Sequence, residues 1–166
     1  MYRIGNGFDA HRFARDRKLI LGGQEIPSEL GLKGYSDADV LTHSICDALL
    51  GAASCGDLGK HFPSNDPRFK DISSLELLKM SYELIKAKGF KIENIDTTII
   101  CEKPKLSNYT QKIAKNISES IGISDSIISI KATTTDGMGF TGRGEGIASY
   151  ATVLLKKVDE TLSSKK

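Results

Sequence analysis

The sequence predicts an α/β (α+β) fold, a single-domain two-layer sandwich in which helices pack on one face of a mixed β-sheet. Segments with a two-residue apolar period alternate along the chain with segments of helical period, and glycines mark many of their ends. The chain has 166 residues, of which 39% are hydrophobic and 27% charged. A chain of this length buries roughly 70% of the surface that its unfolded form exposes, enough for one core. We expect one domain over residues 1–158 and a solvated tail over residues 159–166.

The N-terminal third is predicted to contain a strand, a hairpin and a helix. Residues 1–13 alternate between two faces, as a strand does. One face carries Tyr2, Ile4, Phe8 and Ala10, and the other carries Gly5, Gly7, Asp9 and His11. Residues 18–26 place a Gly-Gly turn between two short apolar runs, the pattern of a β-hairpin. A helix is expected after a capping box of Ser36 and Asp39, with Gly56 at its end. Its apolar stripe consists of Leu41, Ile45, Ala48, Leu49 and Ala52.

The remaining elements follow the same two patterns. Apolar residues recur at helical spacing before Gly89 and before Gly122, while β-branched residues gather in three other segments. We expect helices over residues 73–88 and 107–121, and strands over residues 95–101, 126–134 and 147–157.

Charge and cysteine content argue against several classes of function. The 23 Lys and Arg residues nearly balance the 21 Asp and Glu residues, so a net charge of +2 gives no general affinity for nucleic acid. No stretch approaches the roughly 18 apolar residues that a membrane span needs, and the N-terminus lacks the apolar region of a signal peptide. Cys46, Cys55 and Cys101 lack the spacing of zinc or redox sites, so we expect reduced thiols that pack as small hydrophobic residues. We therefore expect a cytoplasmic protein with no nucleic-acid or membrane partner.

Three residues of types that bind transition metals could meet in the fold. Asp9 and His11 are two positions apart on the first predicted strand, so their side chains leave one face about 7 Å apart at the backbone. Gly5 and Gly7 are expected to keep that face uncrowded. His43 points about 160° away from the apolar stripe of the first predicted helix. One Asp and two His form an ordinary set of ligands for a catalytic zinc, which leaves a fourth coordination position open. The alternative is that the polar faces of the strand and the helix are simply exposed to water.

The loop over residues 133–146 is the other candidate for ligand binding. It concentrates hydroxyl groups, glycines, two acidic residues and an arginine after a predicted strand, a composition that suits phosphate oxygens and a divalent cation. Its GxGxxG match at residues 137–142 is not followed by a helix, and no GK[ST] sequence follows, which argues against dinucleotide and P-loop sites. Close packing between strands would equally explain the glycines. Asp57 is either a ligand contact or a turn residue, and His61 is assigned no catalytic role.

Five ordered motifs extend these observations over nearly the whole chain. They are FDAHRF at residues 8–13, SDADVLTH at 36–43, DALLGA at 47–52, GDLGKHFP at 56–63 and KATTTDGMGFTGRGEGIA at 131–148. Together they closely resemble the 2-C-methyl-D-erythritol 2,4-cyclodiphosphate synthases. The resemblance implies a lyase of non-mevalonate isoprenoid biosynthesis that converts 4-diphosphocytidyl-2-C-methyl-D-erythritol 2-phosphate into the 2,4-cyclodiphosphate and releases CMP. It also implies a homotrimer with active sites between subunits.

The resemblance further implies roles for individual residues. Asp9, His11 and His43 match ligands of zinc or another divalent transition metal, and Asp136 matches the ligand of a magnesium or manganese ion on the substrate diphosphate. The catalytic positions are Thr134 and Tyr35. The implied substrate contacts are Ser36, Asp57, Gly59, Phe62, Pro63, Asp66, Cys101, Lys103, Pro104, Lys105, Leu106, Ser107, Thr133, Phe140 and Arg143. Gly139, Phe140 and Arg143 also resemble residues around a central trimer cavity that holds a prenyl diphosphate.

Three departures from the family pattern affect these expectations. Tyr35 stands where histidine is usual, and a phenol donates one hydrogen bond but carries no positive charge at neutral pH. Its role would persist weakened or move to Ser36 or Lys60. Asp136 replaces the commoner glutamate, and Ser64-Asn65-Asp66 replaces a more acidic run.

Two other classes of function share parts of the pattern. A zinc-dependent phosphoesterase could use the same Asp-x-His pair and helix histidine, and it would release inorganic phosphate or a linear product. A catalytically silent module that binds a nucleotide or a prenyl diphosphate could keep the glycine-rich loop. Neither alternative forms a cyclic product.

Overall fold

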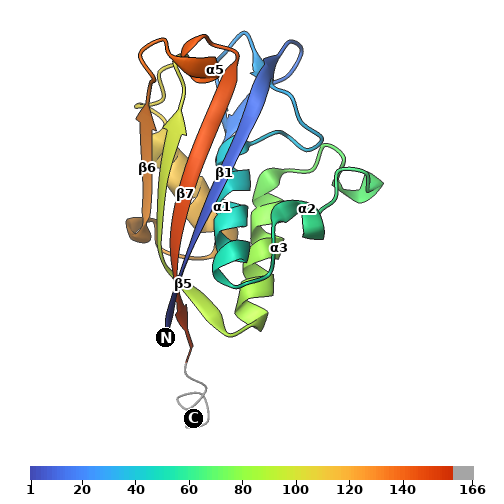
Figure 1. The fold of residues 1–166 in the computed structure, drawn as a ribbon, viewed down its shortest axis with the longest axis vertical. Coiled ribbons are helices and arrows are strands. Elements are labelled where there is room, and N and C mark those ends of the chain that lie inside the picture. The colour runs from blue at the N-terminus through green and yellow to red at the C-terminus, as the bar shows by residue number, and fades with distance from the viewer. Residues whose placement is uncertain (159–166) are drawn as a thin grey trace.

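The computed structural model describes residues 1–158, in which a mixed sheet carries its helices on one face (Figure 1). The sheet consists of β1 (Tyr2–Ala14), β4 (Gly31–Leu32), β5 (Phe90–Ile100), β6 (Ile128–Thr133) and β7 (Gly146–Lys157). The strand order is β4-β1-β7-β5-β6, with β5 and β6 parallel and the other neighbours antiparallel. The predicted hairpin is also present, as β2 (Leu19–Leu21) and β3 (Gln24–Ile26). The predicted fold class is confirmed, and the predicted tail, residues 159–166, lies outside the described residues.

Three long helices cover the sheet. They are α1 (Val40–Ala52), α3 (Ser74–Ala87) and α4 (Thr110–Ile121). α1 packs on β1 and β7, α3 packs on α1, and α4 packs on β6 and α3. α1 ends four residues before Gly56. Asp39 is its N-cap and accepts from the backbone N–H of Thr42, so the predicted capping box with Ser36 as the N-cap is wrong. No helix within residues 1–158 combines the length and the apolar character needed to cross a membrane.

Short helical segments separate these elements. They are α2 (Leu58–His61), α5 (Gly139–Gly142) and the 3₁₀ turns η1 (Pro67–Phe69) and η2 (Asp125–Ile127). The sequence analysis did not predict them, because one turn is too short to show an apolar stripe.

Two glycines of β1 determine how closely α1 approaches the sheet. A Cβ atom on Gly5 would lie 2.1 Å from the carbonyl oxygen of Ala48, and one on Gly7 would lie 2.0 Å from that of Ser44. The expectation that these glycines leave their face uncrowded is therefore wrong, because the backbone of α1 occupies the space. This close approach places the polar side of α1 directly over the end of β1.

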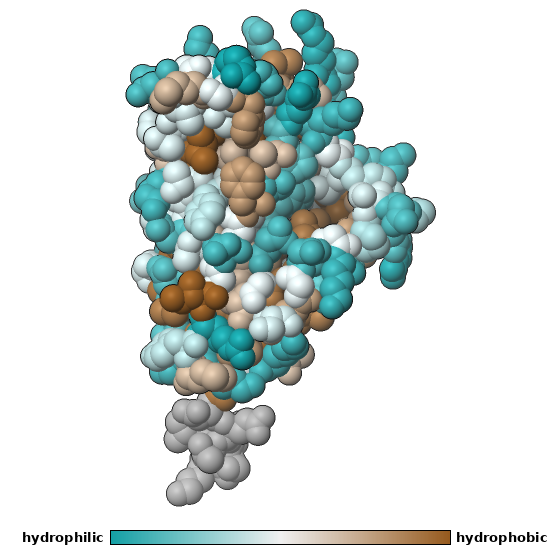
Figure 2. Space-filling model, in the orientation of Figure 1, coloured by the Kyte–Doolittle hydropathy of each residue, from teal (hydrophilic) through white to brown (hydrophobic). Residues whose placement is uncertain are grey.

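The opposite face of the sheet is open and carries large apolar side chains (Figure 2). Tyr2, Ile4 and Phe8 of β1 are 57%, 74% and 55% exposed, and Tyr150 of β7 is 45% exposed. Tyr150 is the register partner of Phe8, so these two rings lie side by side on adjacent strands. Asn6, paired with Thr152, lies between Ile4 and Phe8 on this face, so the exposed apolar side chains are interrupted by polar ones.

The three cysteines are free thiols packed in the core, as the sequence analysis expects. Burial raises the pKa of the Cys46 thiol and raises that of Cys101 to about 11. Both side chains are therefore neutral thiols at physiological pH.

Candidate active site

Asp9 and His11 of β1 meet His43 of α1 at the end of the sheet. Oδ2 of Asp9 lies 2.9 Å from Nε2 of His11 and 3.0 Å from Nδ1 of His43, and the two histidine nitrogens lie 3.2 Å apart. In a tetrahedral site with zinc–ligand bonds of 2.0–2.1 Å, neighbouring ligand atoms are about 3.3 Å apart. These three atoms therefore need to move by only a few tenths of an ångström to hold a divalent transition metal. The predicted meeting of strand and helix is confirmed, and the alternative of two solvated faces is wrong.

Hydrogen bonds outside this metal triad (Asp9, His11 and His43) set the protonation of both imidazoles. Nδ1 of His11 lies 2.6 Å from the carbonyl oxygen of Lys33, which can only accept, so Nδ1 carries the proton and Nε2 presents its lone pair. Nε2 of His43 faces two serine hydroxyl groups, those of Ser36 at 3.1 Å and Ser74 at 2.9 Å, and its Nδ1 faces the triad. This arrangement is typical of metal-binding histidines, whose second nitrogen is held by a hydrogen bond.

The charge of the Asp9 carboxylate also suits a cation, whereas a metal ion would have to displace any proton held on Nε2 of His11. Burial alone would raise the pKa of the Asp9 carboxyl, but the hydrogen bonds and charges of His11 and His43 outweigh burial and hold this pKa well below its usual range. Burial lowers the pKa of His11, but the hydrogen bond and the charge of Asp9 outweigh it, so the pKa of His11 is raised. Asp9 is therefore ionised at any physiological pH, as a metal ligand must be.

The triad opens into a cavity of about 230 Å³, here called the triad cavity. Its lining includes five of the predicted site residues besides His11, together with Leu58, Ser64, Phe69 and Leu77. The five are Tyr35, Ser36, His43, Gly59 and Phe62. Sequence-distant contacts predicted by the family resemblance therefore gather at one place. Asp57 is the N-cap of α2, where its carboxylate accepts from the backbone N–H of Lys60 at 2.9 Å. This capping role explains the presence of Asp57 as well as a ligand contact would. His61, to which the sequence analysis assigns no catalytic role, does not line the triad cavity.

Tyr35 contacts Asp66. Tyr35 stands where the family usually has histidine, and Asp66 lies in the run of residues 64–66 that also departs from the family pattern. The hydroxyl of Tyr35 donates to the backbone carbonyl of Asp66 at 3.2 Å. The Asp66 carboxylate accepts from the guanidinium of Arg68 at 2.6 Å, and this hydrogen bond lowers the pKa of Asp66. Pro63 contributes its carbonyl oxygen to the backbone of Asp66. The Tyr35 hydroxyl thus fastens the loop over residues 62–66 to the wall of the triad cavity.

A second group of predicted residues lies where β5 and β6 end. Here Thr134 and Asp136 are exposed, and Asp136 has a positive φ of 51°. The side chain of Glu102 holds this loop, because its Oε1 accepts from the backbone N–H of Thr135 at 2.9 Å and of Gly137 at 3.3 Å. The sequence analysis missed Glu102. The position of this acidic residue, just after a strand, could have indicated it, because ligands often bind where neighbouring strands end.

A cavity of about 850 Å³ adjoins this group, here called the large cavity. Four predicted contacts line it: Lys103, Pro104, Lys105 and Arg143. Cys101 donates its thiol hydrogen to the carbonyl of Lys103 at 2.9 Å, Leu106 is 3% exposed, and Ser107 is exposed. Thr133 is the last residue of β6 and accepts from the backbone N–H of Cys101. The two segments over residues 101–107 and 133–136, here called the nucleotide loops, are therefore tied together.

Within one chain the triad cavity and the nucleotide loops are separate. Ala10 of β1 is level with Ala148 of β7, Ile100 of β5 and Thr133 of β6. Since neighbouring strands are about 4.8 Å apart, three strand spacings put β6 roughly 14 Å from β1. The two cavities share no lining residue.

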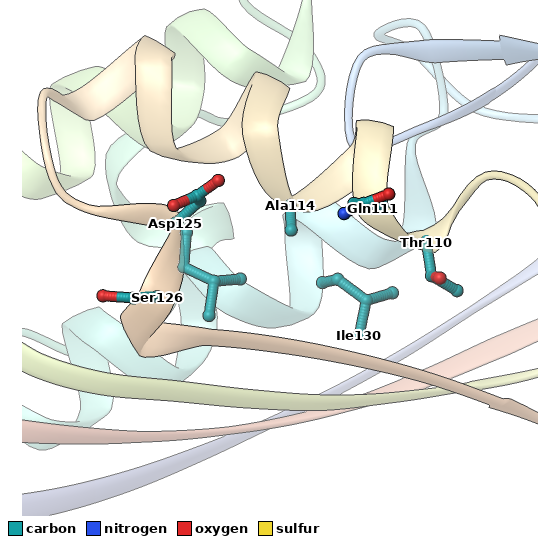
Figure 3. A pocket seen from close by; sticks show the side chains of 7 residues that line it. Thr110, Gln111, Ala114, Asp125, Ser126 and Ile130 are labelled. Atoms are coloured by element: carbon teal, nitrogen blue, oxygen red, sulfur yellow. The ribbon is translucent and has the colours of Figure 1, made fainter.

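Other cavities divide the remaining predicted residues. Phe140, 40% exposed, lines a cavity of about 190 Å³ with Ala10 and Arg12, whereas Arg143 lines the large cavity and forms an ion pair with Glu145 at 2.7 Å. A further cavity of about 320 Å³ lies between α4 and β6, where Ala114 and Ile130 face each other (Figure 3). It contains none of the predicted site residues.

The sequence pattern of the YgbB family matches residues 2–156. The chain belongs to the YgbB family. The 2-C-methyl-D-erythritol 2,4-cyclodiphosphate synthase of Syntrophobacter fumaroxidans is 53% identical over 154 residues, which cover 93% of this chain and 97% of that protein. This relationship confirms the resemblance found in the sequence motifs.

Solved structures agree with this membership of the YgbB family. The Plasmodium falciparum IspF, in a complex with CDP, is 35% identical with a TM-score of 0.83 and matches 95% of this chain and 97% of that chain. The bifunctional IspDF of Campylobacter jejuni is 43% identical with a TM-score of 0.93, and the match covers 97% of this chain and 44% of that chain. The chain therefore corresponds to a little under half of that bifunctional protein.

Proposed function

We propose that this chain converts 4-diphosphocytidyl-2-C-methyl-D-erythritol 2-phosphate into 2-C-methyl-D-erythritol 2,4-cyclodiphosphate and releases CMP, a lyase reaction of non-mevalonate isoprenoid biosynthesis. The observation that carries the proposal is the metal triad at the wall of a cavity in a chain of the YgbB family. Two comparisons support it: a relative named for this product is 53% identical, and a similar solved structure contains CDP.

The reaction is an intramolecular phosphoryl transfer. An oxygen of the 2-phosphate forms a bond to the β-phosphorus, and the bond from that phosphorus to the oxygen of CMP breaks. The attacking oxygen is already anionic near neutral pH, so the chain does not have to supply a strong base. When bound, a transition metal at the triad and a magnesium or manganese ion at Asp136 supply positive charge to the phosphates.

The chain's own residues position the reacting groups. Asp9, His11 and His43 would hold the first metal, and Asp136 would hold the second. The Thr134 hydroxyl stabilises the charge that develops on the transferred phosphoryl group, while Ser36 donates to a phosphate in the triad cavity. The nucleotide loops bind CMP and its cytosine. Holding both ends of one substrate close together removes much of the entropic part of the barrier.

The complete site in this proposal lies between subunits of a homotrimer. The triad cavity and the nucleotide loops would then come from neighbouring subunits; within one chain the loops follow β5 and β6, which lie two and three strand spacings, about 10 and 14 Å, from β1. The open sheet face, with Ile4, Phe8 and Tyr150, supports this assembly because it offers apolar surface for a second copy.

Phosphorus NMR of the purified protein with its substrate and magnesium tests the reaction. We expect cyclic diphosphate and CMP from the wild type, and neither product from the Asp9→Ala variant or a chelator-treated sample. Release of inorganic phosphate would instead identify a hydrolase. Unchanged substrate with a folded, metal-loaded protein would identify a binding module.

A complementation experiment tests the shared site. Asp9→Ala and Asp136→Ala, each inactive alone, are co-expressed with different tags and purified as mixed trimers. If each site takes its triad from one subunit and its nucleotide loops from the next, a random mixture regains about a quarter of the wild-type sites. If each site lies within one chain, the mixture stays inactive.

A prenyl diphosphate in the central cavity of the trimer is a further part of the proposal. Phe140 would offer its aromatic ring to the prenyl chain, and Arg143, which forms an ion pair with Glu145, would offer a cation to the diphosphate. Calorimetric titration with a prenyl diphosphate should show binding to the wild type and weaker binding to Phe140→Ser. A trimer that contains no extractable prenyl diphosphate and binds none that is added would overturn this part.

A further inference from the structure

We infer that Ser74 and Asp37 form a hydrogen-bonded pair that holds the His43 imidazole in the orientation and tautomer required for metal binding. Neither residue is among those to which the family resemblance assigns a role. The inference rests on the metal site of the proposed function and is independent of whether the cyclisation takes place.

The contact between Ser74 and His43 is direct and fully enclosed. Oγ of Ser74 lies 2.9 Å from Nε2 of His43. Ser74 is 0% exposed and His43 only 8% exposed, so water has little access to this hydrogen bond. Ser74 is the first residue of α3, 31 positions from His43 on α1. The contact therefore connects two helices at the rear of the metal triad.

The direction of the hydrogen bonds follows from Asp37. The Ser74 hydroxyl forms a short hydrogen bond with Oδ1 of Asp37, and an ionised carboxylate can only accept. Ser74 therefore donates its hydrogen to Asp37 and offers its oxygen lone pair to His43. Nε2 of His43 must then carry the proton, which leaves the lone pair of Nδ1 directed at Asp9 and His11.

Ser36 also lies near His43, but its hydrogen bonds differ. Its Oγ is 3.1 Å from Nε2 of His43 and accepts from the backbone N–H of Ala38 at 3.2 Å. Unlike that of Ser74, its hydroxyl hydrogen has no carboxylate acceptor, and Ser36 lines the triad cavity. Ser74 is thus the positioning residue for His43, and Ser36 is left to donate to a phosphate.

Asp37 is itself fixed by the start of α3. Its Oδ2 accepts from the backbone N–H of Ser74 at 2.9 Å, and its own N–H donates to the carbonyl of Ile72 at 3.0 Å. Ser73, the N-cap by position, makes no side-chain capping bond, so Asp37 serves as the cap of α3 from outside the helix. The same carboxylate thereby anchors α3 and orients Ser74.

The test compares Ser74→Ala with Ser81→Ala in the full-length protein. Ser81 is a matched control, because it lies on α3, is 0% exposed and donates to the backbone carbonyl of Leu77 at 2.8 Å. Zinc affinity is measured by competition with a chromophoric chelator, without substrate. We expect a loss of about 10- to 100-fold for Ser74→Ala, the range for removing such an outer hydrogen bond, and a change below about twofold for Ser81→Ala.

A spectroscopic measurement separates positioning from a merely structural effect. In the zinc-loaded wild type, the Nε2 proton of His43 should give a slowly exchanging imidazole signal in ¹⁵N-histidine NMR. This signal should broaden or shift in Ser74→Ala and persist in Ser81→Ala. Wild-type zinc affinity with an unchanged His43 signal in Ser74→Ala would overturn the inference. A wild-type protein that binds zinc but forms no cyclic product would overturn the proposed function and leave this inference standing.

Discussion

Replacing Gly7 by alanine should disrupt the metal triad without touching any ligand. The added Cβ atom would lie 2.0 Å from the carbonyl oxygen of Ser44, whereas ordinary contacts begin at 3.4 Å. α1 must therefore move away from β1 by about 1.0–1.4 Å, which brings this contact to between 3.0 and 3.4 Å. His43 moves with α1 while Asp9 and His11 stay on β1, and metal sites tolerate ligand displacements of only about 0.2 Å.

Two measurements follow from this displacement. The affinity for zinc should fall by at least about a hundredfold, more than the typical loss on removing an outer hydrogen bond, because one of three ligands no longer reaches the metal. Overpacking should also cost about 1–3 kcal/mol of stability, which lowers the Tm of a chain of this size by roughly 2–12 °C. Chelator competition and calorimetry provide these two values.

Gly51→Ala is the matched control. Gly51 lies on α1, and its nearest neighbour to an added Cβ is the carbonyl oxygen of Asn6 at an ordinary 3.9 Å. This substitution should leave zinc affinity unchanged and raise stability by about 0.5–1 kcal/mol, since alanine favours a helix over glycine. If Gly7→Ala bound zinc as tightly as Gly51→Ala, the close approach of α1 to β1 would not control the metal site, and the reasoning would be refuted.

Three further substitutions or treatments test other parts of the site. Glu102→Ala leaves two loop N–H groups without their acceptor and should lower kcat about 10- to 100-fold. Glu102→Gln keeps a carbonyl oxygen as acceptor, so its kcat should fall much less. A fully active Glu102→Ala variant would contradict this role. Tyr35→His should retain or raise the turnover rate, and unchanged turnover in Tyr35→Phe, which loses only the hydrogen bond to Asp66, would show that the phenol has no role. Burial raises the pKa of Cys101 to about 11. Alkylation of Cys101 in the native protein at pH 8 should therefore be about a hundredfold slower than alkylation of a thiol of pKa 9, and it should accelerate as the pH rises. Mass spectrometry of labelled peptides measures this rate.

The sequence predicted much of this protein because much of its pattern is local. Glycine turns, capping residues and apolar periods depend on neighbours within a few positions, and they placed the hairpin, the three long helices and the main strands. The alternation of β1 put Asp9 and His11 on one face, and the helical period of α1 put His43 opposite its apolar stripe. The composition of the loop over residues 133–146 likewise made it a candidate for ligand binding, with close packing between strands as the alternative.

The tertiary structure decided what depends on contacts between distant segments. The same glycines that suggested open space on β1 admit the backbone of α1, which turns the polar side of that helix from a solvated face into the wall of a metal site. Ser74 and Asp37 lie 31 and 6 positions from His43, and Glu102 lies 33 positions from the loop it holds. No periodicity connects such residues. Their roles arise from hydrogen bonds about 3 Å long, whose formation requires that whole helices and strands first pack in one arrangement.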